Sequence, residues 1–106
     1  LIIYANRVIR SNIIIEIAGH YDFKLQALNS FPPPILIALT INDRPLDTFS
    51  FDLGDNSWEE QSRQIFLEAG LYSISLSFLN DGYVEINDHI FDRNARVFSL
   101  SIEQLD

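Results

Sequence analysis

The side chains best suited to bind a ligand gather in the segment from Asn80 to Asn94. This segment holds amide and carboxylate groups at Asn80, Asp81, Glu85, Asn87, Asp88, Asp92 and Asn94. Such oxygen donors are the ligands of Ca²⁺, which takes about six to eight of them at a time. The same residue types also form ordinary turns, because their side chains bond to nearby backbone groups. We therefore expect either a calcium site or self-bonded turns here, with a spacing unlike that of an EF-hand.

A strand leads into this polar segment and must position it. Residues 70–78 alternate the apolar side chains of Tyr72, Ile74, Leu76 and Phe78 with serines at 73, 75 and 77. This alternation is typical of a strand with one buried face. The oxygen-rich segment is thus predicted to be a loop at the end of a well-formed strand.

Similar patterns along the chain predict further strands, at residues 1–9, 13–17, 21–28, 35–41, 46–53, 63–68 and 95–105. Turn residues separate them, including the proline-rich segment 29–34, which cannot join a sheet ladder. Residues 57–61 are the segment of the chain most compatible with a helix, and we expect a short irregular segment there, before the strand at 63–68. Seven or eight short strands with such turns predict an all-β fold, an antiparallel β-sandwich (jelly roll) with very little helix.

Composition bounds the protein further. We predict one domain over residues 1–106, with residues 1–12 as either an N-terminal arm or a first strand. A net charge of -8 argues against nucleic acid as a partner. No apolar run approaches the roughly 20 residues that membrane insertion needs. Cysteine is absent, which excludes disulfides and thiolate metal sites, and methionine is absent too, so we expect a processed product or a piece of a longer protein.

The part of the chain from about Gly19 to Glu103 resembles the calcium-dependent carbohydrate-binding modules of the xylan-binding type. The segments that carry the resemblance follow one another in the order 34–36, 40–43, 46–51, Trp58-Glu59-Glu60, 69–72, 78–81 and Asp92-Arg93-Asn94. The sequence departs from the resemblance at Phe98, where the family usually has an aspartate. The resemblance implies a jelly-roll sandwich that binds a polysaccharide without catalysis.

The resemblance also implies roles for individual residues. The implied calcium ligands are Asn80, Asp81, Asp88 and Asp92, with Glu85 as an alternative to Asp88. The implied carbohydrate-binding residues are Trp58, Tyr83, Arg93 and Asn94, the two aromatic rings serving as platforms for a sugar ring. Two structural interpretations stay open: Trp58 as a core residue, and Arg93 as the ion-pair partner of Asp81 or Asp92.

Catalysis is not expected. His20 and His89 are the two histidines, they lie far apart in the sequence, and the G-x-S-x-G motif of a serine nucleophile is missing. We therefore predict a non-catalytic, calcium-dependent carbohydrate-binding module of a secreted, cell-surface or periplasmic protein. The alternative is a structural module that assembles with other protein subunits, since Leu1 to Ile9 is apolar and long apolar edge strands promote strand addition between chains.

Overall fold

The computed structural model describes residues 8–80 and 82–105, and these contain nine strands and no helix. The strands are β1 (Val8–Ile15), β2 (Gly19–Leu28), β3 (Ile35–Ile41), β4 (Arg44–Phe51), β5 (Trp58–Leu67), β6 (Gly70–Phe78), β7 (Gly82–Ile86), β8 (His89–Arg93) and β9 (Val97–Gln104). The described residues accordingly include no helix that is long and apolar enough to cross a membrane. The predicted arm at residues 1–7 lies outside the described residues.

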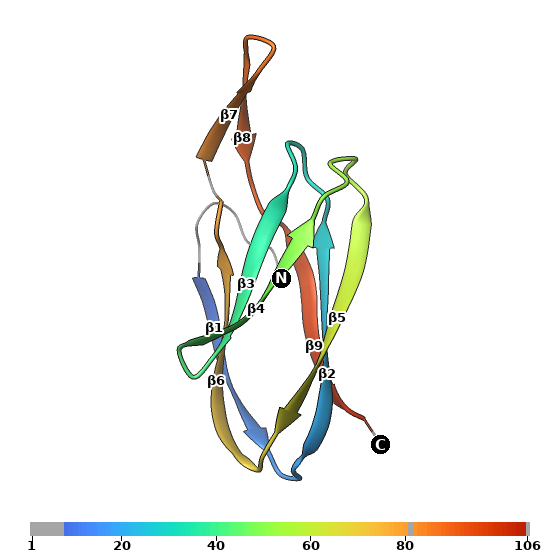
Figure 1. Ribbon diagram of the computed structural model, residues 1–106, viewed down its shortest axis with the longest axis vertical. Coiled ribbons are helices and arrows are strands. Elements are labelled where there is room, and N and C mark those ends of the chain that lie inside the picture. Colours follow the sequence, from blue (N-terminus) through green and yellow to red (C-terminus); the bar gives the residue numbers. More distant parts are fainter. Residues whose placement is uncertain (1–7, 81, 106) are drawn as a thin grey trace.

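Two antiparallel sheets form a β-sandwich, as predicted (Figure 1). One sheet has the strand order β1-β6-β3-β4 and the other has the order β5-β2-β9. The third pair, β7 and β8, is a hairpin that belongs to neither sheet and projects beyond the sandwich along its longest axis (Figure 1). The hairpin contributes to the elongated shape of the molecule, whose extents are 53 × 24 × 19 Å.

The core lies between the two sheets and follows the alternation of the sequence. In β2 the side chains of Tyr21, Phe23, Leu25 and Ala27 are buried, and in β3 every second residue from Ile35 to Ile41 is buried. Because each large apolar side chain stabilises the fold by about 1.5–3 kcal/mol on full burial, this alternation is enough to fix which face of each strand points inward.

Two asparagine-aspartate pairs form tight turns between adjacent strands. Asn42-Asp43 joins β3 to β4 and Asn87-Asp88 joins β7 to β8, and all four residues have positive φ angles. Two-residue hairpin turns need this left-handed backbone, which asparagine and aspartate tolerate better than most residues. The turn interpretation of Asn87-Asp88 is therefore confirmed.

Two expected elements differ from the structure. The irregular segment expected at 57–61 is the first half of β5, which pairs with β2 along its whole length, from Leu28 opposite Trp58 to Gly19 opposite Leu67. The loop expected between Asn80 and Asn94 is the β7–β8 hairpin. Its strands are short, and their alternation is hidden by the polar residues of the segment, so the sequence pattern reads as a loop.

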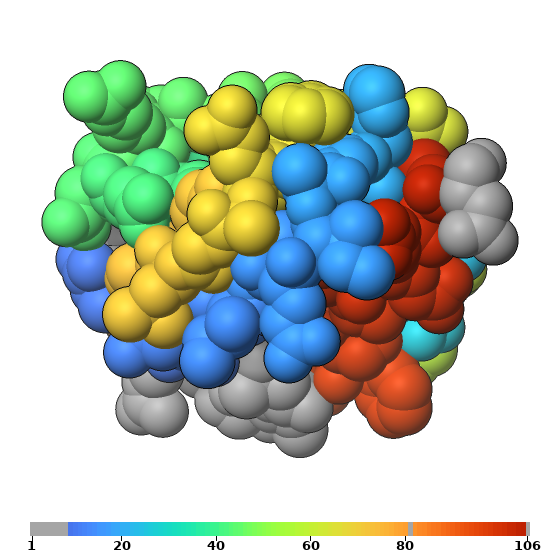
Figure 2. Space-filling view, turned by 90° about the horizontal axis from the view of Figure 1, so that it is seen from below, coloured from blue at the N-terminus to red at the C-terminus, as the bar shows by residue number. Residues whose placement is uncertain are grey.

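The two ends of the sandwich differ in character. Figure 2 shows the end opposite the hairpin, where the β1–β2 turn lies next to the β5–β6 turn. Apolar side chains are exposed near this end, among them Ile14, Ile17 and Leu71. The polar loops that follow β2, β4, β6 and β8 lie at the hairpin end instead (Figure 1). The loops that could offer polar groups to a ligand therefore lie at the hairpin end.

Candidate functional site

A pocket of ≈ 370 Å³ opens at the hairpin end of the three-stranded sheet. It lies where the loop after β2, the loop before β5 and the connection from β8 to β9 meet. Its lining residues are Leu28, Ser30, Phe31, Asn56, Asp92, Asn94 and Arg96. The structure thus brings Asp92 and Asn94 into one pocket, and adds Asn56 and Arg96, which the sequence did not single out.

An exposed aromatic pair lies beside this pocket. The rings of Trp58 and Phe98 meet edge to face with centroids 6.1 Å apart, and 49% and 60% of these residues are exposed. Leu28, which lines the pocket, is opposite Trp58 in the sheet. Its N–H donates to the carbonyl of Arg96 at 2.9 Å, and Arg96, another lining residue, lies two residues before Phe98. Trp58 is therefore a surface residue and not a core residue.

Phe98 reaches the surface because of an irregularity in the sheet. The pairing of β2 with β9 shifts between Gln26, which is opposite Ser99, and Ala27, which is opposite Val97, so Phe98 is the unpaired extra residue. A bulge of this kind turns a side chain to the other face of the strand. Simple alternation places Phe98 with Leu100 and Ile102, and no sequence signal marks the bulge.

Asn29 holds the loops around the pocket together. Its side chain is fully buried, accepts the N–H of Leu53 at 3.1 Å and donates to the carboxylate of Glu59 at 3.1 Å. Its backbone binds Ser57 and Asn56, each at 2.8 Å. The sequence pattern predicts only a plain loop at position 29, because nothing in a single sequence distinguishes a buried asparagine from an exposed one.

The loop before β5 is braced by Asp55. Its carboxylate accepts the N–H of Ser57 at 3.0 Å and also the Ser57 hydroxyl. These hydrogen bonds, the one from the hydroxyl first, lower the pKa of Asp55 below its ordinary value of 3.8. Hydrogen bonds to a carboxylate favour its charged form, which accounts for the direction of this shift.

The base of the hairpin is clamped to the proline-rich loop. The amide of Asn80 accepts the N–H of Leu36 at 3.0 Å and donates to the carbonyl of Pro34 at 2.7 Å. Arg93 donates to the carbonyls of Pro32 at 3.1 Å and of Pro33 at 3.5 Å. In the described residues Arg93 thus binds backbone carbonyls, whereas the sequence analysis gave it sugar hydroxyls or an ion pair.

The implied calcium ligands are not gathered in the part of the chain that the structure describes. Asp88 lies in the turn at the hairpin tip, about 13 Å along the strand from Asp92 at the observed rise per residue of a strand. Oxygens that share one Ca²⁺ lie within about 5 Å of each other. No group of three or more acidic or histidine residues that could hold a metal is present in residues 8–80 and 82–105. Asp81 lies outside these residues.

Tyr83 is placed apart from the aromatic pair. It lies in β7 opposite Asp92 and is 78% exposed. On the other face of the hairpin, Phe91 meets Phe31 edge to face with a centroid separation of 4.9 Å. Phe31, which lines the pocket, therefore connects the hairpin to the sandwich.

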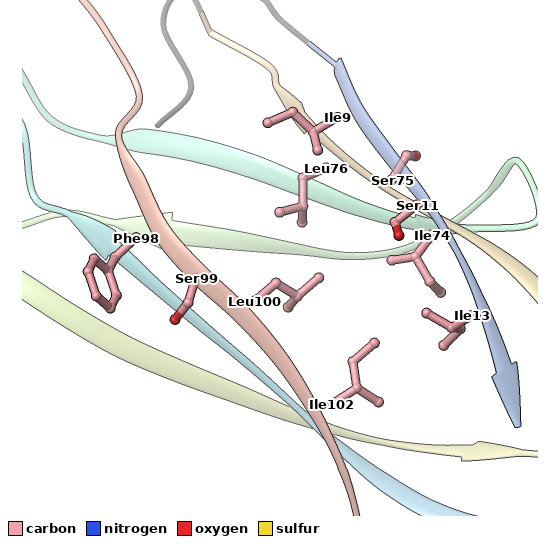
Figure 3. Close-up of a pocket in the computed structure, with 10 residues that line it drawn as sticks. All are labelled: Ile9, Ser11, Ile13, Ile74, Ser75, Leu76, Phe98, Ser99, Leu100 and Ile102. Atoms are coloured by element: carbon pink, nitrogen blue, oxygen red, sulfur yellow. The ribbon is translucent and has the colours of Figure 1, made fainter. Parts of the chain in front are cut away.

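A second hollow lies along the seam between β1 and β9, and its volume is ≈ 380 Å³ (Figure 3). Its lining is mainly apolar: six aliphatic residues, Ile9, Ile13, Ile74, Leu76, Leu100 and Ile102, together with Phe98 at one end. The polar groups in it are serine hydroxyls, and that of Ser75 is bonded to Thr40. This seam groove offers a polar ligand little to bind, because specific sites need polar groups that converge on the ligand.

No protein-family model and no curated protein matches the sequence. The fold does match solved structures. A family 36 carbohydrate-binding module of a multidomain xylanase from the hindgut metagenome of Trinervitermes trinervoides is 20% identical, with a TM-score of 0.70 over 96% of this chain and 74% of the module. A family 35 carbohydrate-binding module from an environmental isolate is also 20% identical, with a TM-score of 0.68 over 92% of this chain and 66% of that module.

A ruminal endo-β-1,4-mannanase matches as well, at 13% identity and a TM-score of 0.67, over 97% of this chain and 19% of the enzyme. The chain therefore spans 66–74% of the two isolated modules and about a fifth of the mannanase. At these identities the comparison concerns the fold. The chain has the β-sandwich fold of the family 35 and family 36 carbohydrate-binding modules.

Proposed function

We propose that this chain is a non-catalytic carbohydrate-binding module that takes a glycan at the pocket beside Trp58 and Phe98. The observation that carries the proposal is the exposed aromatic pair of Trp58 and Phe98: Leu28, which is opposite Trp58 in the sheet, and Arg96, two residues before Phe98, both line a pocket that offers amide, carboxylate and guanidinium groups. A sugar ring has an apolar face and a rim of hydroxyls, so its recognition needs an aromatic surface and polar side chains close together. The matching fold supports the same function.

The aromatic pair and the pocket would bind different parts of the sugar. The rings of Trp58 and Phe98 would cover the apolar face of one sugar. Asp92 would accept hydroxyl protons, and Asn56 and Asn94 can both donate and accept. Arg96 adds a charged donor at the pocket edge.

The same lining favours binding over catalysis. A glycosidase usually needs two carboxyl groups that flank the scissile bond, roughly 5–9.5 Å apart. Among the described lining residues, Asp92 is the one that carries a carboxyl group. Because the structural matches include modules and parts of a xylanase and a mannanase, we propose β-1,4-linked polysaccharides as the ligand class and a secreted or cell-surface parent protein.

Replacing Trp58 with alanine is expected to weaken glycan binding about tenfold, because a lost stacking contact is worth on the order of 1–1.5 kcal/mol. The measurement is affinity electrophoresis or calorimetry with xylan, glucuronoxylan and mannan, in chelator and in millimolar Ca²⁺. Phe66→Ala is the matched control, since Phe66 is an equally exposed aromatic residue of β5 at the other end of the strand. An intact protein that binds none of these glycans, or equal affinities for wild type and Trp58→Ala, would contradict the proposal.

The seam groove supports a second candidate function, assembly with another copy of the chain. In the described residues β1 pairs with β6 alone and β9 with β2 alone, so both strands that border the aliphatic groove are edge strands. Edge strands beside an apolar surface favour strand addition. We expect light scattering during gel filtration to show a dimer that Ile13→Glu converts to a monomer. A wild-type chain that is monomeric at every concentration would rule this candidate out.

A further inference from the structure

Backbone carbonyls from two loops converge on the guanidinium of Arg93. The Nε group donates to the carbonyl of Pro32 at 3.1 Å, and the two terminal nitrogens lie 3.5 Å from the carbonyls of Pro33 and Asn80. Two of these carbonyls come from the proline-rich loop and the third from the connection before β7. A single side chain of the hairpin thus joins three oxygens from two separate parts of the chain.

Converging carbonyls place the negative ends of several dipoles close together, and a cation between them relieves the repulsion. Calcium sites use backbone carbonyls in this way. A guanidinium is suited to the same position, because it is charged at every accessible pH and directs several N–H groups in a fixed plane. Asn80 adds to the clamp, since its side chain is already bonded to Leu36 and Pro34.

The described carboxylate nearest in sequence points elsewhere. Asp92 precedes Arg93 in β8, and neighbouring residues of a strand project to opposite faces. Asp92 lies opposite Tyr83 and accepts the side-chain amide of Asn94 at 3.3 Å. Among residues 8–80 and 82–105, the oxygens bonded to Arg93 are therefore neutral carbonyls, which the cationic side chain balances.

We infer that the guanidinium of Arg93 is the cation that holds the base of the hairpin on the proline-rich loop, the position for which the sequence pattern predicts Ca²⁺. The guanidinium fixes the hairpin on the proline-rich loop, and the order of this end of the molecule does not depend on a divalent ion. The inference concerns the cation of the loop and is separate from glycan binding.

The first test compares thermal unfolding of the wild-type protein after exhaustive chelation and in millimolar Ca²⁺. We expect midpoints that agree within about 1 °C, whereas a resident ion well above its dissociation constant would raise the midpoint by roughly 10 °C or more. A rise of that size that disappears in Asp81→Ala or Asp92→Ala overturns the inference. Since glycan affinity is not the readout, failure of the glycan proposal does not affect this result.

The second test removes the guanidinium. Arg93→Ala is expected to lower the midpoint by about 6 °C or more, because several part-buried acceptors lose a charged donor. Ethylguanidinium at low millimolar concentration should restore part of this loss, while the same concentration of sodium chloride should not. Arg10→Ala is the control for charge, since Arg10 forms an exposed ion pair with Asp43 on the four-stranded sheet.

Arg93→Lys covers the case in which the alanine variant does not fold. Lysine keeps the charge but cannot direct separate N–H groups to three carbonyls, so its midpoint should also fall below that of the wild type. Midpoints of Arg93→Lys and Arg93→Ala that equal that of Arg10→Ala would overturn the inference, as would rescue by sodium chloride.

Discussion

Replacing Asn29 with alanine is expected to lower the free energy of unfolding by about 3 kcal/mol, one of the larger losses a single polar residue can cause. The side chain is fully buried and bonds Leu53 through its oxygen and Glu59 through its nitrogen. Alanine would leave the part-buried N–H of Leu53 and one carboxylate oxygen of Glu59 without these partners. An unpaired buried polar group costs about 1–3 kcal/mol, more if it is charged.

The measurement is urea or thermal unfolding followed by circular dichroism, with an expected fall in midpoint of roughly 12–20 °C for a domain of this size. Asn12→Ala is the matched control, because Asn12 is exposed on the edge strand β1. A midpoint for Asn29→Ala within about 2 °C of that of Asn12→Ala would show that water replaces the hydrogen bonds of Asn29, and that this residue does not hold the loops of the pocket.

The fold could be predicted because its strands carry a simple signal. Phe23 and Leu25 alternate with charged and polar residues, and the structure buries both. Ile74 and Leu76 in β6 follow the same rule. A period of two determines the buried face of a strand without reference to any other strand, and the turn residues between strands limit the arrangements to a few.

The site could be predicted only in part, because it depends on long-range pairing. Asp92 and Asn94 were expected to bind a ligand and do line one pocket, but Asp88 is separated from them by the length of the hairpin. That separation follows from the pairing of β7 with β8, which polar residues conceal. Phe98 is exposed through a bulge that arises where β2 and β9 pair, and a single sequence does not contain this register.

For the proline-rich loop, the conformation could be predicted from the sequence but the contacts could not. Its composition predicts an extended segment outside the sheets, and residues 29–34 do lie outside them. Its function as a scaffold was not predicted. It provides carbonyls to Arg93 and Asn80, it places Phe31 against Phe91, and Pro33 packs against Gly54. These contacts turn a connector into the support of the hairpin and of one wall of the pocket.

Replacing Gly54 with alanine is therefore expected to destabilise the protein by about 2–5 kcal/mol. Gly54 has a φ angle of +62°, where a side chain costs about 1–2 kcal/mol. A Cβ atom there would also lie 2.8 Å from two ring carbons of Pro33. Because that ring belongs to a stiff loop, the overlap would have to be relieved by moving the backbone, at a typical cost of about 1–3 kcal/mol.

Asn56→Gly and Asn56→Ala together separate the two contributions in the same unfolding experiment. Asn56 also has a left-handed backbone, with φ at 60°, and lies in the same loop. The difference in stability between these two variants measures the cost of a Cβ atom at this backbone alone, and we expect the alanine variant to be less stable by about 1 kcal/mol. A larger loss in Gly54→Ala would then report the contact with Pro33. A loss in Gly54→Ala equal to that difference would mean that the proline-rich loop yields easily, and a loop that yields could not hold the hairpin and the pocket wall in the positions that glycan binding requires.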